Sequence, residues 1–414
     1  MHQVTLVRGA RQLLSLRGAS GPRRGADLRN LGLIQDGAVL IVDGRIQDVG
    51  PSRRVENLAL ARDADVIEAS GRVVMPGFID GHTHLVSGPI QIPDYEMRVA
   101  STGSPAAARS IHETSPRTLE LQALDAAAQA IRHGTTTLEA KSGFGLTEAN
   151  EIKILRVHSA LKKRSVPLAS TFLCAQVAPE YRDRPEQYLD WVCSNVMPLI
   201  HRRKLAEFAD IRSEPGAFSV EQARRYLLAA RQLRFGLKIQ IRGHSPGEAI
   251  RMAVELGVLS ISDATHATPD DAALLAQSQT VTILLPGPAF YLSGQPYPPA
   301  RMLIDSGVAV ALASNNNAET SPSQNMQMTI ALACGNMSMT PAEAVTAATI
   351  NAAHALGKGS SLGSLEFGKS ADLLILSVPD YREIPYHFGV NQVELVMKDG
   401  AVLVERSEVK WPVP

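Results

Sequence analysis

The sequence is poor in cysteine and has no net charge. Three cysteines occur in 414 residues, Cys174, Cys193 and Cys334, widely spaced and without a Cys-x-x-Cys pair. This pattern argues against a disulfide framework and predicts a reducing, cytoplasmic compartment. Basic and acidic residues balance at 41 each, so no overall field would recruit nucleic acid or an anionic membrane.

Long apolar runs are also missing. No window reaches the roughly 18 consecutive apolar residues that a membrane helix needs, and residues 1–6 do not start a signal peptide. We therefore expect a soluble globular protein. At 414 residues the chain exceeds one ordinary core. About 250 residues would suit an α/β barrel, which leaves the rest for a second domain.

Residues 71–364 alternate between short apolar runs and longer amphipathic segments. This alternation is typical of a barrel of parallel strands, so we predict an α/β fold with a (β/α)8 TIM-type barrel over this range. The expected strands are 73–79, 135–139, 168–173, 208–212, 237–241, 259–262, 281–285 and 308–313. The expected helices are 118–132, 148–162, 220–233, 246–256, 270–277 and 341–355.

The flanking segments, residues 1–70 and 365–414, share a sequence pattern that differs from that of residues 71–364. Both carry short β-branched runs separated by glycines, and each has an Asp-Gly pair between two such runs, Asp43-Gly44 and Asp399-Gly400. Asp-Gly between apolar runs is a strong hairpin signal. We predict that the two segments together form one composite β-sandwich domain.

Two histidines stand one residue apart at the end of the first expected barrel strand, His82 and His84. Alternate residues of a strand face the same way, so both imidazoles would project side by side. Imidazole nitrogens suit zinc and iron, and the pair is half of a metal site. The alternative is two unrelated polar residues at a strand end.

Longer motifs favour the first interpretation. The stretch Pro-Gly-Phe-Ile-Asp-Gly-His-Thr-His at 76–84 resembles the first barrel strand of the amidohydrolase superfamily, and residues 347–357 with 363–376 resemble its last helix and return strand. Residues 134–146, 284–292 and 331–344 are similar to the imidazolonepropionase family, whose members open an imidazolone ring with a metal-bound water. The resemblance covers nearly the whole chain and implies the barrel, the composite domain and a homodimer.

The departures from that family affect its metal site. Gln240 occupies the position of a metal-binding histidine, Asn315 that of a metal-binding aspartate, and Gly243 that of a proton-transferring glutamate. Neutral amides bind divalent ions more weakly than imidazole or carboxylate. The sequence therefore predicts a degenerate metal site without standard zinc hydrolysis. It leaves two states open, either no cofactor or one divalent ion, zinc or iron, held by His82 and His84.

The remaining polar residues of the strand ends are assigned as follows. Residues that would transfer protons or hold a weak metal are His82, His84, Asp263 and His244. Residues that would bind substrate are Arg242, Gln176, Asn317, Phe144, Lys141 and Ser142, the last two at the rim of the site. Arg242 would attract an anionic substrate, or else form an internal salt bridge with Glu139 or Asp263.

The predicted function is that of an imidazolonepropionase-like enzyme acting on a C–N bond of a small cyclic amide, amidine or imine. Its reaction would be hydrolysis, ring-opening or a related cyclisation or elimination. Two alternatives are kept. One is a catalytically silent relative that binds a ligand or partner, and the other is a true metal-dependent imidazolonepropionase with rebuilt ligands.

Overall fold

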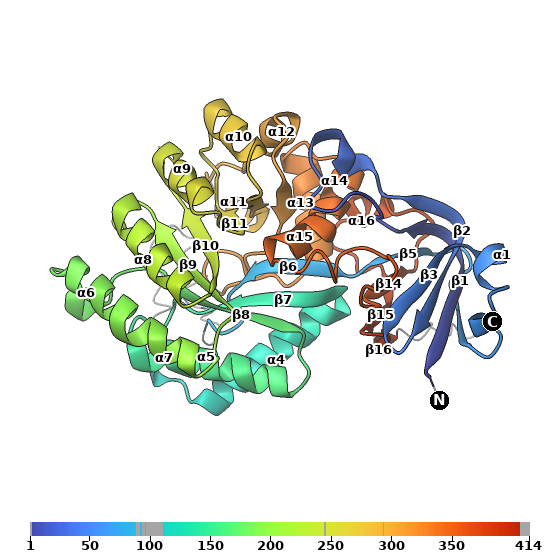
Figure 1. Cartoon of the computed structure of the whole chain (residues 1–414), viewed down its shortest axis with the longest axis horizontal. Helices are drawn as coiled ribbons and strands as arrows, with labels where there is room; N and C mark the ends of the chain where they lie inside the picture. Colours follow the sequence, from blue (N-terminus) through green and yellow to red (C-terminus); the bar gives the residue numbers. More distant parts are fainter. Residues whose placement is uncertain are drawn as a thin grey trace.

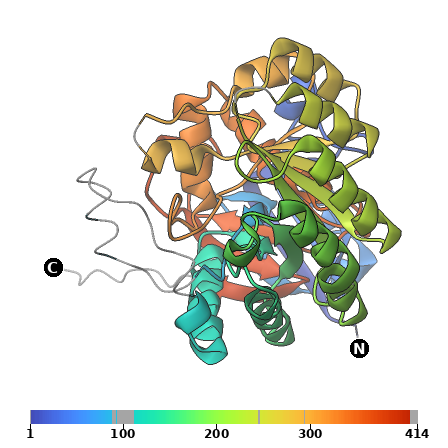
Figure 2. The ribbon, with the colours of Figure 1, turned by 90° about the vertical axis from the view of Figure 1, so that its left-hand side faces the viewer.

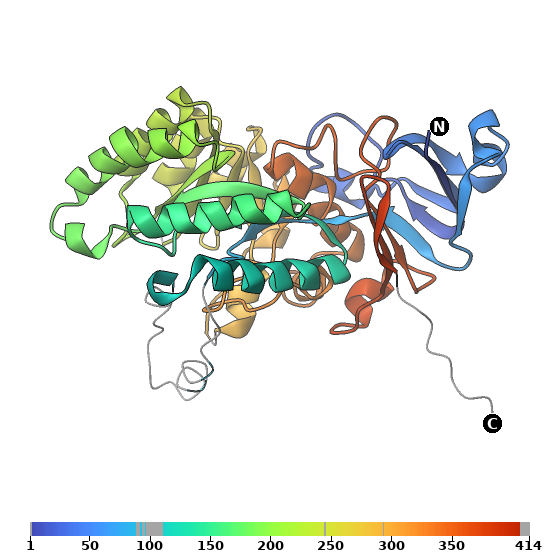
Figure 3. The same cartoon turned by 90° about the horizontal axis from the view of Figure 1, so that it is seen from below.

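The computed structural model describes residues 2–87, 92, 96, 111–243, 246–292 and 294–405. Two sheets lie one beyond the other along the longest axis of the molecule (Figure 1). The barrel forms one end, and a mixed sheet built from both ends of the chain forms the other, as the view from below also shows (Figure 3).

The barrel sheet contains eight strands in sequence order, and every neighbouring pair is parallel. The strands are β6 (Phe78–Thr83), β7 (Thr135–Lys141), β8 (Leu168–Cys174), β9 (Phe208–Ser213), β10 (Gly236–Ile241), β11 (Ser260–Ser262), β12 (Val281–Leu284) and β13 (Val310–Leu312). The first and last strands meet just past β13, where Thr83 forms a parallel bridge with Asn316 and the His84 amide donates to the Asn316 carbonyl at 2.7 Å. The predicted eight-stranded barrel is confirmed.

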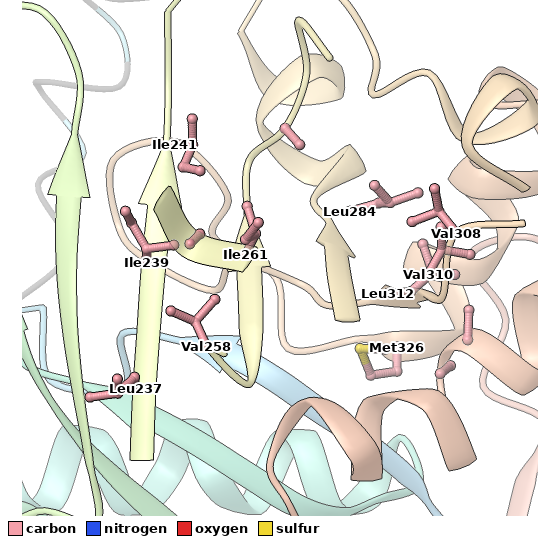
Figure 4. Close-up of a cluster of buried hydrophobic side chains, with 14 of the residues drawn as sticks. Leu237, Ile239, Ile241, Val258, Ile261, Leu284, Val308, Val310, Leu312 and Met326 are labelled. Carbon is pink, nitrogen blue, oxygen red and sulfur yellow. The ribbon is translucent and has the colours of Figure 1, made fainter. Parts of the chain in front are cut away.

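Alternation along each strand separates an apolar face from a polar one. On β10, Leu237, Ile239 and Ile241 belong to the large apolar cluster between strands and helices (Figure 4). The intervening Lys238 and Gln240 are buried on the opposite face. Because successive side chains of a strand point to opposite faces, these two polar residues lie inside the barrel.

Helices surround the strands, as the view onto the barrel end shows (Figure 2). They are α4 (Pro116–Arg132), α5 (Glu148–Lys163), α6 (Pro185–Trp191), α7 (Met197–Arg202), α8 (Val220–Gln232), α9 (Gly247–Glu255), α10 (Pro269–Ala276), α11 (Pro286–Tyr291), α12 (Ala300–Asp305), α13 (Met326–Asn336), α14 (Pro341–Ala347) and α15 (Ile350–Ala355). Side-chain caps such as Ser115, Thr147 and Ser219 fix where the longer ones begin. No helix among the described residues is long and apolar enough to cross a membrane.

The single helix expected over 341–355 is two helices in the structure. α14 ends at Ala347 and α15 begins at Ile350, with Thr349 outside helical geometry at φ −127° and ψ −95°. The carbonyl of Ala348 accepts a hydrogen bond from the amide of Ile79 at 2.9 Å instead of continuing the helix. The prediction was wrong here because a tertiary contact with β6 replaced the local helical bond.

The second sheet joins both ends of the chain, in the order β16-β15-β14-β5-β1-β2-β3 with β4 beside β1. Its strands are β1 (Val4–Leu14), β2 (Leu33–Val42), β3 (Arg45–Pro51), β4 (Asp65–Glu68), β5 (Val73–Pro76), β14 (Leu373–Leu376), β15 (Val393–Lys398) and β16 (Ala401–Glu405). Short helices α1 (Ser52–Val55) and α16 (Glu383–Tyr386) accompany it. The N- and C-terminal segments thus share a sheet, as expected.

The strand expected at 73–79 divides between the two sheets. β5 pairs with β14 in the mixed sheet, and β6 starts the barrel one residue after β5 ends. Gly77 lies at the break, where a Cβ would stand 2.2 Å from Cγ2 of Thr136, so only glycine fits. The prediction of one continuous strand was wrong because the apolar run did not reveal that its two halves pair with different partners.

Both predicted hairpins are present. Asp43 and Gly44 have φ of 47° and 76°, and Asp399 and Gly400 have φ of 48° and 79°. Two consecutive residues in the left-handed region are what a two-residue hairpin turn between twisted strands requires, and Asp-Gly tolerates this conformation. The turns also touch each other, because Gly44 packs against the carbonyl of Asp399.

Candidate active site at the barrel mouth

His82 and His84 lie at the C-terminal end of β6, the end at which active sites of such barrels form. Their side chains are buried, with 1% and 4% of the residue surface exposed. The ring centroids are 5.4 Å apart, and the rings of Phe144 and His84 pack edge to face with 4.8 Å between their centroids. Among the described residues, neither Nδ1 atom has a hydrogen-bond partner. The structure therefore brings the two imidazoles together as predicted. One nitrogen of each ring, Nδ1, forms no hydrogen bond within the described residues.

Both imidazoles are held in the neutral form. Burial lowers the pKa of His82 and His84 well below the usual value, and the nearby ammonium of Lys141 lowers it further. Arg242 adds to this effect at both rings, and Arg212 adds to it at His84. Neutral imidazole accepts protons, so either ring can take up a proton during a reaction at neutral pH and release it again.

Four charged residues lie buried inside the barrel on β7, β9 and β10. The ammonium Nζ of Lys141 is 2.8 Å from Oε1 of Glu139 and 2.8 Å from Oδ2 of Asp210. The ammonium of Lys238 is 2.8 Å from Oε2 of Glu139. Each of the four is at most 1% exposed. We call these residues, Glu139, Lys141, Asp210 and Lys238, the charged floor.

Pairing decides the ionisation of the charged floor. Burial opposes the charge of Glu139, but Lys141 and Lys238 outweigh burial and lower its pKa. Burial likewise opposes the charge of Lys141, but Asp210 and Glu139 raise its pKa above the usual value. Lys238 has fewer partners, and burial lowers its pKa to about 8. Lys141 was expected at the rim of the site; it lies inside the barrel, because residues 135–141 all belong to β7.

The residues present do not fit a tightly bound divalent ion. The side-chain amide of Gln240 donates to Oδ2 of Asp210 at 3.2 Å, and that of Asn315 faces Thr320 at 3.4 Å. Within the described ranges, no three histidine, cysteine or acidic side chains gather as a ligand set. Two imidazoles with neutral amides give a weak donor set, and the surrounding cations repel a dication.

Arg242 and Asp263 form an ion pair at the ends of β10 and β11. Asp263 has a φ of 65° and also accepts a hydrogen bond from Oγ1 of Thr265 at 3.0 Å. Of the two salt bridges considered for Arg242, the structure contains the one with Asp263, because Glu139 is occupied by the lysines of the charged floor. Arg242 and Asp263 remain predicted site residues, and in the structure their charges are paired with each other.

Of the remaining predicted residues, Ser142 lies beside the imidazole pair, since its backbone forms a hydrogen bond with His84. The amide of Asn317 is used locally, since Nδ2 donates to the Asn315 carbonyl at 2.6 Å and Oδ1 accepts from the Thr320 amide at 2.8 Å. The Ser142 hydroxyl accepts from the amide of Leu173 at 3.2 Å. Gln176 is exposed just after β8. His244 lies outside the described residues.

The sequence analysis missed three charged residues, Asp210, Arg212 and Lys238, and the buried role of Glu139. A signal for them was present. Lys238 stands between Leu237 and Ile239, and Asp210 stands between Ala209 and Ile211. A charged residue flanked by apolar ones inside a buried strand must face a polar interior, because an unpaired charge cannot be buried among apolar side chains.

Comparisons with known proteins identify the family. The profile of the amidohydrolase family matches residues 73–403. Imidazolonepropionase of Symbiobacterium thermophilum is 40% identical over 98% of this chain and 98% of its own length. Imidazolonepropionase of Geobacillus kaustophilus is 40% identical over 97% and 98%.

Solved structures share the fold at lower identity. A triazine hydrolase variant aligns with a TM-score of 0.74 and 17% identity, over 97% of this chain and 95% of that one. An adenosine deaminase from Xanthomonas campestris, with bound zinc, aligns with a TM-score of 0.65 and 17% identity over 97% and 93%. The chain therefore belongs to the amidohydrolase family and is an imidazolonepropionase-like member of it.

Proposed function

We propose that this protein is an enzyme that hydrolyses a C–N bond in a small cyclic amide, amidine or imine. The observation that carries the proposal is the buried, neutral pair His82 and His84 at the mouth of a barrel with full-length similarity to imidazolonepropionases. The substrate is a small molecule bearing an anionic group. We also propose a homodimer in the cytoplasm, with domains at 71–364 and at 1–70 with 365–414.

The chemistry follows from what the residues can accept and stabilise. One neutral imidazole takes a proton from a water molecule, whose oxygen forms a bond with the ring carbon. Negative charge that develops on the substrate feels the positive potential of Lys141, Lys238 and Arg212. The C–N bond then breaks, and the ring nitrogen receives the proton that the imidazole holds. Water is the only co-reactant.

The weak donor set implies that this chemistry proceeds with a site free of tightly held metal. Metal content per chain, measured by mass spectrometry after purification without chelator or affinity nickel, should be well below one equivalent. The variant Gln240→His/Asn315→Asp, which supplies an imidazole and a carboxylate, should retain more zinc than the natural chain. One equivalent of zinc or iron in the natural protein, lost in His82→Ala/His84→Ala, would contradict this part of the proposal.

The activity itself is tested with a panel of imidazolones, cyclic ureas and lactams. Mass spectrometry should detect a product heavier by one water, and His82→Ala/His84→Ala should lower the rate by roughly 100-fold or more because the proton acceptor is lost. His133→Ala is the matched control, since that ring bonds the Gln129 carbonyl at the end of α4. Binding of panel members without turnover of any would favour the catalytically silent alternative.

A further inference from the structure

The loop that joins β7 to α5 lies against one of the two imidazoles of the candidate site. The backbone of Ser142 forms a hydrogen bond with His84, and the ring of Phe144 packs edge to face with the His84 ring. We call residues 142–146 the His84 loop. Because two of its residues contact the imidazole, the position of this loop affects the orientation of the ring.

The His84 loop is bound by one buried carboxylate, that of Glu151 in the first turn of α5. Oε2 of Glu151 accepts from the amide of Gly143 at 2.8 Å. Oε1 accepts from the amides of Gly145 at 2.7 Å and Leu146 at 3.1 Å. Hydrogen bonds from backbone N–H groups to an ionised carboxylate are stronger than neutral ones, so a single side chain holds most of the loop.

The backbone of the His84 loop adopts a conformation that needs this support. Leu146 has a φ of 61°, in the left-handed region that is unfavourable for a leucine. Gly145 lies so close to α5 that a Cβ would stand 2.6 Å from the backbone nitrogen of Glu151. The carboxylate therefore fixes a strained segment directly onto the start of the helix.

Glu151 has no competing partner among the described residues. All hydrogen bonds of its carboxylate come from the His84 loop, including one from the side chain of Ser142. In contrast, Glu139 and Asp210 of the charged floor each contact an ammonium. Burial raises the pKa of Glu151, and the donors of the loop oppose this rise. The charge of the carboxylate and the conformation of the loop thus stabilise each other.

We infer that Glu151 is a positioning residue for His84. It acts through the His84 loop, which it holds so that Ser142 and Phe144 stay against the imidazole. Misplacing a catalytic group by about 1 Å can slow a reaction by about 100-fold, so the orientation of this ring matters for proton transfer. The inference rests on the proposed function where it takes His84 as a proton acceptor, but the contact itself can be tested without a substrate.

The first test follows the contact between the rings by fluorine nuclear magnetic resonance. A 4-fluorophenylalanine placed at position 144 reports the ring current of His84, and His84→Ala gives the signal without that contribution. In Glu151→Gln the amide cannot accept from all three backbone N–H groups, so the signal should move at least halfway from the natural position toward that of His84→Ala. Asp271→Asn, a buried carboxylate bound to the amide of Thr268, is the matched control and should leave the signal unchanged.

Urea unfolding followed by circular dichroism separates displacement of the loop from loss of the fold. The shifted signal should belong to folded protein, with a position different from that in 8 M urea. If Glu151→Gln does not unfold cooperatively, Glu151→Asp takes its place, because it keeps the charge but withdraws the oxygens from the loop. An unchanged signal in the folded variant would overturn the inference, as would natural and His84→Ala proteins with the same signal.

The second test uses the panel compound that the natural protein hydrolyses fastest. Glu151→Gln should lower kcat by roughly 10-fold or more and change KM by less than about 3-fold, because the proton acceptor is displaced. Asp271→Asn should keep both constants. An unchanged kcat with a displaced fluorine signal would show that the loop does not position His84 for reaction. Absence of turnover by the natural protein would count against the proposed function, while the fluorine comparison would still decide whether Glu151 holds the loop on His84.

Discussion

At the scale of single residues, the barrel interior is organised by charge balance. Glu139 accepts from Lys141, from Lys238 and from Oγ1 of Thr171, the last at 2.5 Å. Buried charges are tolerable only when each has such partners, because desolvation removes the stabilisation that water would give. Burial, and after it the nearby cations led by Lys141, lowers the pKa of His82 and His84 and keeps both rings neutral.

Removing one member of the charged floor should therefore be costly. Lys238→Met leaves Glu139 with a single ammonium and should lower the free energy of unfolding by about 3–5 kcal/mol. The double variant Lys238→Met/Glu139→Gln should recover part of this loss, because the uncompensated charge is gone. Urea unfolding measures both. Lys162→Met, which breaks an exposed pair with Glu207, is the control and should cost about 1 kcal/mol or less; an equal loss in the two single variants would contradict the prediction.

The pKa of Lys238 also predicts a pH dependence. In the folded protein this pKa is lowered to about 8 by burial, from a usual value of 10.5. Between these two values the unfolded chain keeps a proton that the folded chain has released, so this residue makes stability rise with pH in that window. The free energy of unfolding between pH 7.5 and 10 should rise more, or fall less, in the natural protein than in Lys238→Met. Parallel curves for the two proteins would show that the lysine does not titrate there.

At the scale of elements, turns and breaks hold the two sheets in register. The β2–β3 turn and the β15–β16 turn come from opposite ends of the chain and meet at Gly44 and Gly400. A Cβ on Gly44 would lie 2.3 Å from the Asp399 carbonyl oxygen. Gly44 is therefore required for two reasons. It adopts the positive φ of its own hairpin, and its lack of a side chain lets the β15–β16 turn approach closely.

Two glycines with nearly the same φ, Gly44 and Gly71, allow the strain of a positive φ to be measured separately from the contact between the turns. Gly44→Ala, at φ 76°, should lower the free energy of unfolding by about 2–4 kcal/mol, from left-handed strain plus the clash with Asp399. Gly71→Ala, at φ 77° with nothing within 4 Å of the added Cβ, should cost only about 1 kcal/mol. Chemical denaturation of both variants gives the comparison. A similar cost for both would mean that the contact between the turns yields without penalty.

At the scale of the whole molecule, the barrel and the mixed sheet are joined at several points. β5 and β6 are separated by Gly77 alone, and Oε1 of Gln327 on α13 accepts from the amide of Gln392, next to β15. Nδ2 of Asn351 on α15 donates to the carbonyl of Arg23 at 2.9 Å. These links favour one cooperative unit over two domains that unfold separately.

Cooperative unfolding can be tested by a substitution that destabilises the mixed sheet and a fluorescent probe that reports on the barrel. Trp191 at the end of α6 becomes the only tryptophan in a Trp411→Phe background. Adding Leu373→Ala, a change in the core of the mixed sheet, should lower the midpoint of both the Trp191 fluorescence change and the far-ultraviolet circular dichroism change by the same amount. A shift in circular dichroism with an unchanged Trp191 midpoint would instead show independent domains.

Much of the fold could be predicted from local pattern. The eight barrel strands and both Asp-Gly hairpins follow from periodicity and turn chemistry, which act over a few residues. The break at Gly77 and the break at Thr349 could not be predicted, since each depends on a partner strand far away in sequence.

The sequence by itself determined that His82 and His84 project together and that Gln240 and Asn315 supply neutral amides, because strand alternation and residue chemistry are local properties. Only the tertiary structure decided how the charges pair. Lys141 lies between Glu139 and Asp210, Arg242 faces Asp263, and Nε of Arg212 has no hydrogen-bond partner in the part of the chain that the structure describes. The reason is physical: the stability of a buried charge depends on which opposite charges lie within a few ångströms, and that distance is set by strands that come together only when the barrel closes.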